Sequence, residues 1–451
     1  MIEKEIFHSV RLDEDKCKGC THCIRHCPTE AIRVKEGKAR IDEERCIDCG
    51  ECIRICPNHA KYAQADFLEV IKKFSYAIAL PAPAFYAQFK VDISLGKILQ
   101  GLLHLGFQEV FEIARGAEIL AEEINRYLKK RGLITPVISS ACPAVVRLIE
   151  VRFPSLIENL LPLDSPLGVA AKLARIQAME KGYRPEEIGV FFITPCPAKV
   201  TESRQSKSGL GRIDGAISIT NVYSQLVNIV GELKESSSLP LASFRGIGWA
   251  RSGGEQDSLE EGEYMAVDGI HQVISVLEKI EMGELKNVVY CEAQACVGGC
   301  IGGVLAVQNP FIAKVNINHL LKKYTEFRPV KEEEMEKWRR KGVFKRKEIY
   351  QAKEVLKLDK DFKRALEKYQ MIEKLLEKLP GLDCGACGSP TCRALAEDIV
   401  RGRAEEIDCP FMLRDRLLSL SKEIHALASR VPQTMAKRGG VKNLDESESN
   451  H

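Results

Sequence analysis

Tightly grouped cysteines are the residues of this 451-residue chain best suited to chemistry. The chain holds 17 cysteines, and in residues 291–303 two of them, Cys296 and Cys300, lie among glycines. Thiolates bind soft metals and iron–sulfur clusters, and neighbouring glycines let backbone N–H groups approach an inorganic cluster closely. The apolar residues 288–290 predict a buried strand, so we expect both thiols in a loop at the end of a strand. The alternative is a glycine-rich turn whose two cysteines are only buried.

A doubled cysteine pattern near the N-terminus indicates two further metal sites. The spacing Cys-x2-Cys-x2-Cys-x3-Cys-Pro occurs twice, at Cys17, Cys20, Cys23 and Cys27 and at Cys46, Cys49, Cys52 and Cys56. This spacing resembles that of bacterial two-cluster ferredoxins, in which three close cysteines hold one [4Fe–4S] cube and the fourth holds the other. The expected ligand sets are therefore Cys17, Cys20, Cys23 and Cys56, and Cys46, Cys49, Cys52 and Cys27. Zinc in tetrahedral four-ligand sites is the alternative.

A third group of cysteines lies near the C-terminus and precedes and follows a predicted helix. Its members are Cys384, Cys387, Cys392 and Cys409, with the spacing Cys-x2-Cys-x4-Cys-x16-Cys. The spacing resembles the small [4Fe–4S] domain of electron-transfer complexes, corrinoid proteins and some sensory hydrogenases. Of all 17 cysteines only Cys291 fits no such position, and we expect it to be a buried core thiol.

Strands that alternate with amphipathic helices between residues 75 and 320 are expected to position the central cysteines. Apolar runs at 76–80, 135–138, 188–193 and 288–290 predict buried, mostly parallel strands, each followed by a candidate site loop. Ligand sites in open α/β sheets lie beyond the carboxyl ends of the strands. We therefore expect the loops to bring together Cys142, Cys196, Cys296 and Cys300.

Over roughly residues 10–320 these motifs resemble those of the [FeFe]-hydrogenases. The closest likeness is the pattern Glu-x-x-Ala-Cys-x-Gly-Gly-Cys at residues 292–300, and residues 105–111, 164–166 and 249–254 also have family counterparts. The resemblance implies that a four-iron cube of the H-cluster is held by Cys142, Cys196, Cys296 and Cys300. It also implies a diiron subcluster with CO, cyanide and azadithiolate, bridged to the cube by Cys300. Lys199 would then hydrogen-bond one cyanide, and Pro83 and Ala84 would pack around the other.

The chain departs from the family pattern along the proton path. Ala141 stands where catalytic hydrogenases have a proton-carrying cysteine. Leu161, Ile124 and Tyr127 stand at the positions of the relay serine and two relay glutamates, and Thr194 and Gln294 replace two methionines near the diiron site. This loss of a whole path resembles the sensory type of [FeFe]-hydrogenase.

Two carboxylates are candidate substitutes for the missing relay. Glu255 and Glu292 both lie in predicted cluster-side loops, and a buried carboxylate can be tuned to carry protons. The alternative for Glu292 is hydrogen bonding within its own loop.

The resemblance implies a slow, H2-sensing hydrogenase that interconverts H2 with protons and electrons through four [4Fe–4S] clusters. Its expected partners are ferredoxin or another redox or signalling protein, together with hydrogenase maturation proteins. The alternatives are an ordinary ferredoxin-linked hydrogenase and a hydrogenase-like iron–sulfur assembly protein without the diiron site.

The expected fold is an α/β hydrogenase-type catalytic domain with mostly parallel sheets, an α+β two-[4Fe–4S] ferredoxin domain and a small helical [4Fe–4S] domain. The predicted boundaries are 1–65 for the ferredoxin domain, 70–325 for the catalytic domain, 326–378 for a charged helical connector, 379–412 for the last cluster domain, and 413–451 for a helix and a disordered tail. Within the connector, residues 332–346 mix acids and bases densely and are expected to be solvated. A net charge of +3 gives no case for nucleic-acid binding. Without a secretory or membrane-length apolar run, we expect a soluble cytoplasmic protein with no membrane partner.

Overall fold

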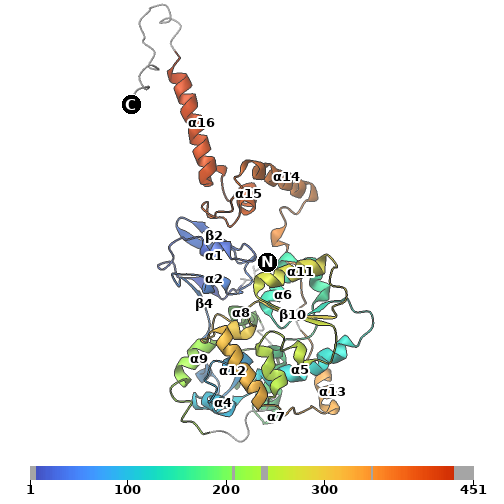
Figure 1. Ribbon diagram of the computed structural model, residues 1–451. Coiled ribbons are helices and arrows are strands. Elements are labelled where there is room, and N and C mark those ends of the chain that lie inside the picture. The colour runs from blue at the N-terminus through green and yellow to red at the C-terminus, as the bar shows by residue number, and fades with distance from the viewer. Residues whose placement is uncertain (1–6, 206–208, 235–241, 347–348, 431–451) are drawn as a thin grey trace, which may run out of the picture. The chain divides into compact units, whose positions relative to one another are not determined.

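The computed structural model describes residues 7–205, 209–234, 242–346 and 349–430 (Figure 1). The chain divides into two compact units, Met1–Lys357 and Leu358–His451. The predicted tail after residue 430 lies outside the described residues. No helix within the described ranges is long and apolar enough to cross a membrane.

The first part of unit 1 is a small α+β fold built from two similar halves. Its elements are β1 (Val10–Leu12), α1 (His22–Arg25), β2 (Ile32–Lys35), β3 (Lys38–Ile41), α2 (Glu51–Arg54) and β4 (Lys61–Ala63). Strand β1 pairs antiparallel with β4, and β2 pairs antiparallel with β3. Ile24, Ile32, Ala39 and Ala60 form its small core together with Cys17 and Cys23. The predicted ferredoxin-like domain therefore has the expected class of fold.

A four-stranded parallel sheet forms the centre of unit 1. Its strands, in order, are β6 (Glu109–Val110), β5 (Tyr76–Pro81), β8 (Ile188–Thr194) and β9 (Gly215–Ser218). Every residue of β5 and β8 is buried, as expected for parallel strands covered on both faces. Because side chains alternate along a strand, Ile78 and Leu80 pack on one face of the sheet, and Ala77 and Ala79 pack on the other.

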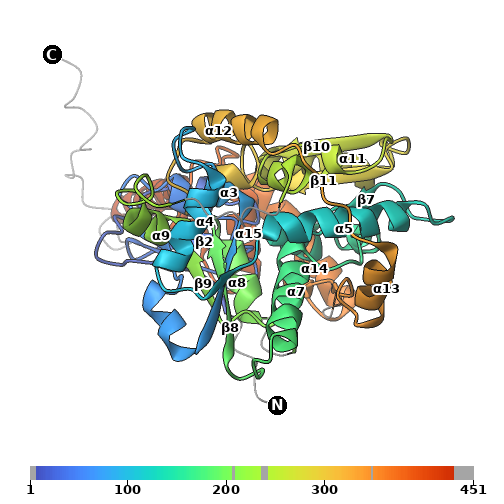
Figure 2. The same cartoon turned by 90° about the horizontal axis from the view of Figure 1, so that it is seen from below.

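Helices cover both faces of this sheet. On the face of Ile78 lie α5 (Ile113–Leu128) and α7 (Pro166–Glu180), which are side by side in Figure 2. On the opposite face lie α3 (Pro83–Tyr86), α4 (Leu95–His104), α9 (Ile219–Leu226) and α12 (Pro310–Lys323). The short elements η1 (Leu68–Lys73), α10 (Phe244–Ile247), η3 (Gly248–Ala250) and η4 (Gln256–Ser258) complete this part.

Unit 1 contains a second parallel sheet of three strands. Its strands, in order, are β10 (Tyr264–Asp268), β11 (Tyr290–Gln294) and β7 (Val137–Ile138). It packs against α6 (Pro143–Arg152), η2 (Pro154–Asn159) and α11 (Ile270–Glu281). The strand predicted at 288–290 instead begins at Tyr290 and continues to Gln294, because β10 pairs with it along its whole length. The remaining elements of this unit are α8 (Pro197–Gln205), η5 (Cys300–Gly302) and η6 (Glu354–Leu356).

The prediction that residues 332–346 form a solvated connector is wrong. Helix α13 (Glu332–Arg340) buries Met335 and Trp338, which lie three residues apart and therefore on one helical face. Val343 and Phe344 follow them into the core on the α5–α7 side of the central sheet. The dense charges that suggested a solvated segment lie on the rest of the helix surface.

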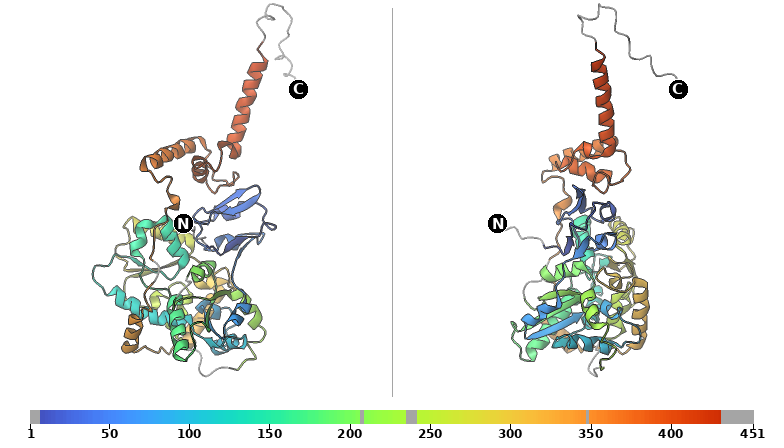
Figure 3. Two further views of the ribbon diagram at one scale, coloured as in Figure 1. Left: turned by 180° about the vertical axis from the view of Figure 1, so that it is seen from behind. Right: turned by 90° about the vertical axis from the view of Figure 1, so that its left-hand side faces the viewer.

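Unit 2 is helical and has its own small core. It contains α14 (Phe362–Lys378), α15 (Cys392–Val400), η7 (Glu406–Asp408) and α16 (Pro410–Ala428). Ile372 and Leu375 of α14 pack with Leu395 and Ala396 of α15, so α14 belongs to this unit rather than to a connector. Helix α16 extends from the others as one straight rod (Figure 3).

Candidate metal centre

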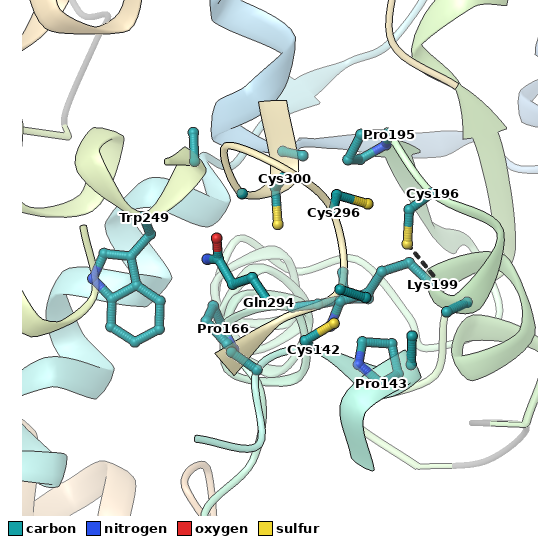
Figure 4. Close-up of a pocket in the computed structure, with 18 of the residues that line it drawn as sticks. Cys142, Pro143, Pro166, Pro195, Cys196, Lys199, Trp249, Gln294, Cys296 and Cys300 are labelled. Carbon is teal, nitrogen blue, oxygen red and sulfur yellow. Dashed lines mark hydrogen bonds between the residues drawn. The ribbon is translucent and has the colours of Figure 1, made fainter. Parts of the chain in front are cut away.

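Four cysteines from three loops line one cavity of about 100 Å³ (Figure 4). Cys142 is the N-cap of α6 just after β7, and Cys196 lies between β8 and α8. Cys296 and Cys300 follow β11. The strands that present these residues belong to two sheets rather than one, and the structure still brings all four predicted cysteines to the same cavity.

The burial of these thiols suits a metal cluster. Burial raises the pKa of Cys296 and of Cys300 to about 12, and it raises the pKa of Cys196 well above its usual value. Neighbouring thiols of the same set act in the same direction. Cys196, Cys296 and Cys300 therefore remain thiols at neutral pH unless a bound cation stabilises their thiolate forms. The donor set and its enclosure therefore fit an iron–sulfur cluster held by four cysteines.

Glycines allow the loops around this cavity to approach one another closely. Gly299 has a φ of 91°, and a Cβ there would lie 2.6 Å from the backbone nitrogen of Ser252. A Cβ on Gly303 would lie 2.4 Å from the carbonyl oxygen of Pro195. Only glycine fits at both positions, so the loop of Cys296 and Cys300 packs directly against the two neighbouring loops.

Lys199 places a positive charge on the wall of the cavity. Its backbone N–H donates to Cys196 Sγ at 3.4 Å, and its Nζ donates to Glu202 Oε2 at 2.8 Å. Burial lowers the pKa of Lys199, but the ion pair with Glu202 outweighs burial and leaves the pKa raised. The side chain is therefore an ammonium that can pair with a bound anion.

The predicted proline–alanine loop contributes to the cavity only in part. Ala82 and Pro83 line the cavity. Ala84 lies one residue further in α3 and packs into the core beneath the central sheet. The structure therefore places Pro83, but not Ala84, beside the space enclosed by the cysteines.

A chain of buried polar groups begins behind Ala141. The methyl group of Ala141 lines the cavity, and its backbone N–H donates to Ser139 Oγ at 3.2 Å. Ser139 Oγ in turn donates to Glu255 Oε2 at 2.7 Å, and the hydroxyl of Tyr290 donates to Glu255 Oε1. Burial raises the pKa of Glu255 to about 7. Sequence reasoning missed Ser139 and Tyr290, although both lie on or beside predicted strands that lead to the site.

Glu292 anchors the turn that carries Glu255. It lies in β11 rather than in a loop, and its carboxylate accepts backbone N–H groups of Gly253, Glu255 and Gln256 at 3.0, 3.1 and 3.0 Å. The alternative of bonding within its own loop is thus also wrong. Burial, followed by repulsion from Glu255, raises the pKa of Glu292 to about 8.

Two other relay positions are apolar, and the positions of the two family methionines hold uncharged polar side chains. Ile124 and Leu161 are buried in the core on the α5–α7 side. Thr194 Oγ1 accepts the backbone N–H of Cys196 at 3.2 Å. Gln294 lines the cavity, and its Oε1 has no hydrogen-bond partner among the described residues.

Cysteines from the two halves of the N-terminal repeat lie close together. Burial raises the pKa of Cys23 to about 11, and Cys56 of the second repeat is among the thiols that raise it further. Burial also raises the pKa of Cys49, and Cys27 of the first repeat adds to the increase. The two ligand sets stay a prediction.

The second ferredoxin-like loop borders the central cavity, which Asp48 and Cys49 help to line. The buried Asp48 Oδ2 accepts Arg147 Nη1 of α6 at 2.7 Å and Thr201 Oγ1 of α8 at 2.8 Å, and it lies 3.1 Å from His8 Nδ1. Burial raises the pKa of Asp48, but the bonds to His8 and Arg147 outweigh burial and lower it. Asp48 therefore fixes this loop to the two helices that begin beside Cys142 and Cys196.

In unit 2 the C-terminal cysteines gather at one end of α15. Cys392 begins this helix, Cys387 and the buried Cys409 pack in the same core, and Cys384 is exposed. Burial raises the pKa of Cys387, and the thiols of Cys409 and Cys384 act in the same direction. This arrangement can hold one further cluster.

Three family models match parts of the chain. Residues 75–254 match "Iron only hydrogenase large subunit, C-terminal domain", and residues 9–57 match "4Fe-4S dicluster domain". Residues 379–411 match a family of Fe–S cluster domains.

Curated relatives and a solved structure agree with these matches. The periplasmic [Fe] hydrogenase large subunit of Nitratidesulfovibrio vulgaris is 34% identical over 233 residues, which are 47% of this chain and 55% of that protein. Iron hydrogenase 1 of Clostridium pasteurianum is 26% identical over 270 residues, which are 49% of this chain and 46% of that protein. The chain thus spans about half the length of these relatives. The apo [FeFe]-hydrogenase HydA1 of Chlamydomonas reinhardtii has a similar fold, with a TM-score of 0.50 and 17% identity over 63% of this chain and 98% of that one.

Proposed function

We propose that the chain is an [FeFe]-hydrogenase-like protein with a ferredoxin-like N-terminal domain, and that it interconverts H2 with protons and electrons slowly, as an H2 sensor. The observation that carries this proposal is the cavity in which four cysteines meet the ammonium of Lys199 and the methyl group of Ala141. The cysteines and the ammonium suit an anionic metal cluster, whereas the methyl group cannot pass a proton.

The residues of the cavity fit the H-cluster as a cofactor. Cys142, Cys196, Cys296 and Cys300 would hold its four-iron part, and Cys300 would also bridge to a diiron part with CO, cyanide and azadithiolate. When bound, this cofactor would supply the chemistry that cleaves and forms H2. Lys199, kept charged by Glu202, would pair with an anionic ligand on the wall of the cavity.

Glu255 is the residue best placed to handle protons. With a pKa of about 7, its Oε2 can gain or lose a proton near neutral pH, and Ser139 Oγ lies between it and the Ala141 backbone. The second candidate carboxylate, Glu292, accepts the backbone N–H of Glu255 and so fixes the turn that carries it. Since Ser139 and the backbone of Ala141 separate Glu255 from the cavity, transfer along this route is expected to be slow.

Electrons are proposed to leave through the ferredoxin-like domain. Cys49 of the second cube lines the same cavity as the central cysteines, and Arg54 Nη2 of α2 donates to the carbonyl oxygen of Gly302 at 2.7 Å. Together with the cluster of unit 2 this makes four [4Fe–4S] sites. The proposed partners are ferredoxin or another redox or signalling protein, and maturation proteins that supply the diiron part. The cytoplasmic location stays a prediction, and one relative is periplasmic by name.

The experiment combines infrared spectroscopy, iron analysis and kinetics on anaerobically reconstituted and maturated protein. We expect CO and cyanide bands, about 18 iron atoms per chain, and H2 oxidation far slower than that of an ordinary hydrogenase. Cys300→Ser should abolish the bands while the ferredoxin-type clusters persist. Fast turnover would instead favour an ordinary ferredoxin-linked hydrogenase, and iron without CO and cyanide bands would favour an iron–sulfur assembly protein.

A further inference from the structure

Lys61 is a buried lysine of the ferredoxin-like domain. It begins β4, where it pairs with Leu12 of β1 in the backbone ladder, and only 4% of its surface is exposed. Its Nζ has no hydrogen-bond partner among the described residues. A charge withdrawn from water is unfavourable unless an opposite charge compensates it. The environment of Lys61 must therefore supply negative charge that the polypeptide alone does not.

The internal repeat shows what this position requires for folding. In the first half the backbone N–H of Ala31 donates to Cys27 Sγ at 3.2 Å, and in the second half that of Ala60 donates to Cys56 Sγ at 3.3 Å. The next residue is Ile32 in one half and Lys61 in the other, with 2% and 4% of their surfaces exposed. The first half of the repeat therefore folds with an apolar side chain at this buried position. Folding alone does not require a lysine at position 61.

Lys61 lies beside cysteines of both predicted cubes. Its strand partner Leu12 and its chain neighbour Ala60 pack in one small core with Cys23 and Cys52. Cys23 belongs to one expected ligand set and Cys52 to the other. Lys61 is therefore close to both sites, which thiolate-ligated clusters would make strongly negative.

We infer that Lys61 is a redox-tuning residue whose buried ammonium is the counter-charge of the two ferredoxin-type cubes and raises the reduction potential of both. This rests on the proposed cofactor load. Reduction adds one electron, and hence one negative charge, to a cube, and a fixed positive charge in a poorly solvated site stabilises the reduced form. Lys61 would thus favour electrons residing in the ferredoxin-like domain, between the central cavity and the electron acceptor.

The test is a potentiometric titration of the reconstituted full-length protein with dithionite, followed by electron paramagnetic resonance. Signals that a Cys23→Ser/Cys52→Ser variant loses identify the two ferredoxin-type cubes. Lys61→Ile copies the residue of the first half and should fold, and Lys61→Met is a second neutral variant. At a fixed potential either should lower the ratio of reduced to oxidised cube about tenfold, a shift of about 59 mV for one electron.

Two controls separate charge from packing. Lys61→Arg keeps the charge and should keep the potentials near those of wild type, and Ile32→Met changes the matching position without a charge and should leave them unmoved. Unchanged potentials in Lys61→Ile at full iron content would overturn the role of Lys61 alone. Absence of iron at the ferredoxin cysteines in wild type would overturn the proposed cofactor load and the role of Lys61 together.

Discussion

Ala141 limits the chemistry of the central cavity more than any other single side chain. Ala141 lines the cavity together with the cysteines, and its methyl group can neither donate nor accept a proton. The nearest titratable carboxylate in the hydrogen-bonded chain behind it, Glu255, is reached only through Ser139. A well-placed acid or base contributes roughly 10²–10⁴-fold to a rate, and its absence sets the expected slowness.

The first prediction is that Ala141→Cys alone restores little H2 oxidation. A thiol at the cavity wall would gain no onward carrier at the relay positions, because Ile124 and Leu161 are buried among apolar residues. The measurement is the H2 oxidation rate of wild type and variant at matched cluster occupancy. A variant approaching the rate of an ordinary hydrogenase would show that the position of Ala141 is the whole defect.

The second prediction concerns the two carboxylates. Glu255→Gln keeps the shape of the side chain and one acceptor oxygen, and its NH2 group can donate to the other hydroxyl, but it removes the titratable proton. Residual H2 oxidation should therefore fall roughly 10²-fold or more. Glu292→Gln should also reduce the rate, because Glu292 holds the turn of Glu255 through three backbone N–H groups. Ser139→Ala is the matched control for the connection between Glu255 and the backbone of Ala141. Unaltered rates in Glu255→Gln at full cluster occupancy would exclude this route.

The third prediction is the pH dependence of stability. The pKa of Glu255 rises from 4.5 to about 7 and that of Glu292 from 4.5 to about 8, so the folded chain binds more protons than the unfolded chain within this range. The free energy of unfolding should therefore fall as pH rises from 4.5 to 8, by at most about 1.4 kcal/mol per pH unit for each group. Thermal unfolding midpoints between pH 5 and 8.5 should decline less steeply in Glu255→Gln. An identical decline in the variant would contradict the raised pKa.

At the scale of elements, the strands that sequence reasoning found are those that are apolar throughout. Strands β5 and β8 are buried on both faces, and their continuous apolar runs mark them directly. The predicted strand ends at residue 290, where β11 begins, because Glu292 and Gln294 interrupt the apolar pattern along β11. Their polar groups face the 253–256 turn and the cavity, which are contacts between distant segments that local sequence cannot reveal.

The candidate site was more predictable than the elements around it. Cysteine spacing indicates the N-terminal and C-terminal candidate ligands, since few other functions need that pattern. Cys142 and Cys196 stand alone in the sequence, and the predicted strand ends placed them with the other two central cysteines. Asp48 was missed because its partners Arg147 and Thr201 lie 99 and 153 residues further along the chain. The burial of one face of helix α13 was not predicted, because only two apolar side chains, Met335 and Trp338, lie among many charged residues.

The fourth prediction tests Asp48 as the link between the ferredoxin-like domain and helices α6 and α8. Asp48 has a φ of 52°, like Gly19 with 65° at the equivalent place in the first repeat, so glycine suits its backbone. Asp48→Gly should nevertheless destabilise unit 1 by about 3–5 kcal/mol, because it leaves Arg147 buried without its carboxylate. The measurement is the thermal unfolding midpoint together with hydrogen exchange of residues 8–64.

A compensating variant separates charge from strain at this link. Arg147→Met in the Asp48→Gly background removes the unpaired charge and should recover part of the lost stability. If Asp48→Gly left both the midpoint and the exchange unchanged, the ion pair would contribute nothing to holding the domain.

At the scale of the whole molecule, the chain consists of two units that have separate apolar cores. Unit 1 contains the central cavity and the eight N-terminal cysteines, and unit 2 contains the four C-terminal cysteines. Cluster assembly in one unit therefore does not require side chains from the other. The C-terminal cluster is expected to act as an electron exit or as a redox input rather than in H2 chemistry itself.

The fifth prediction follows from this division. Deleting residues 358–451 removes unit 2 whole, so the cores of unit 1 remain intact and H2 oxidation with a small artificial dye should be largely preserved. Deleting only residues 379–451 is the matched control. This shorter deletion leaves α14 in place but removes the packing partners of Ile372 and Leu375, so we expect that protein to aggregate. The measurements are dye-linked H2 oxidation, infrared bands and iron content, which should fall by about four atoms in the longer deletion. Loss of the CO and cyanide bands in the 358–451 deletion would contradict this prediction. Unit 2 would then stabilise the central cavity, and the C-terminal cluster would maintain that cavity rather than carry electrons away from it.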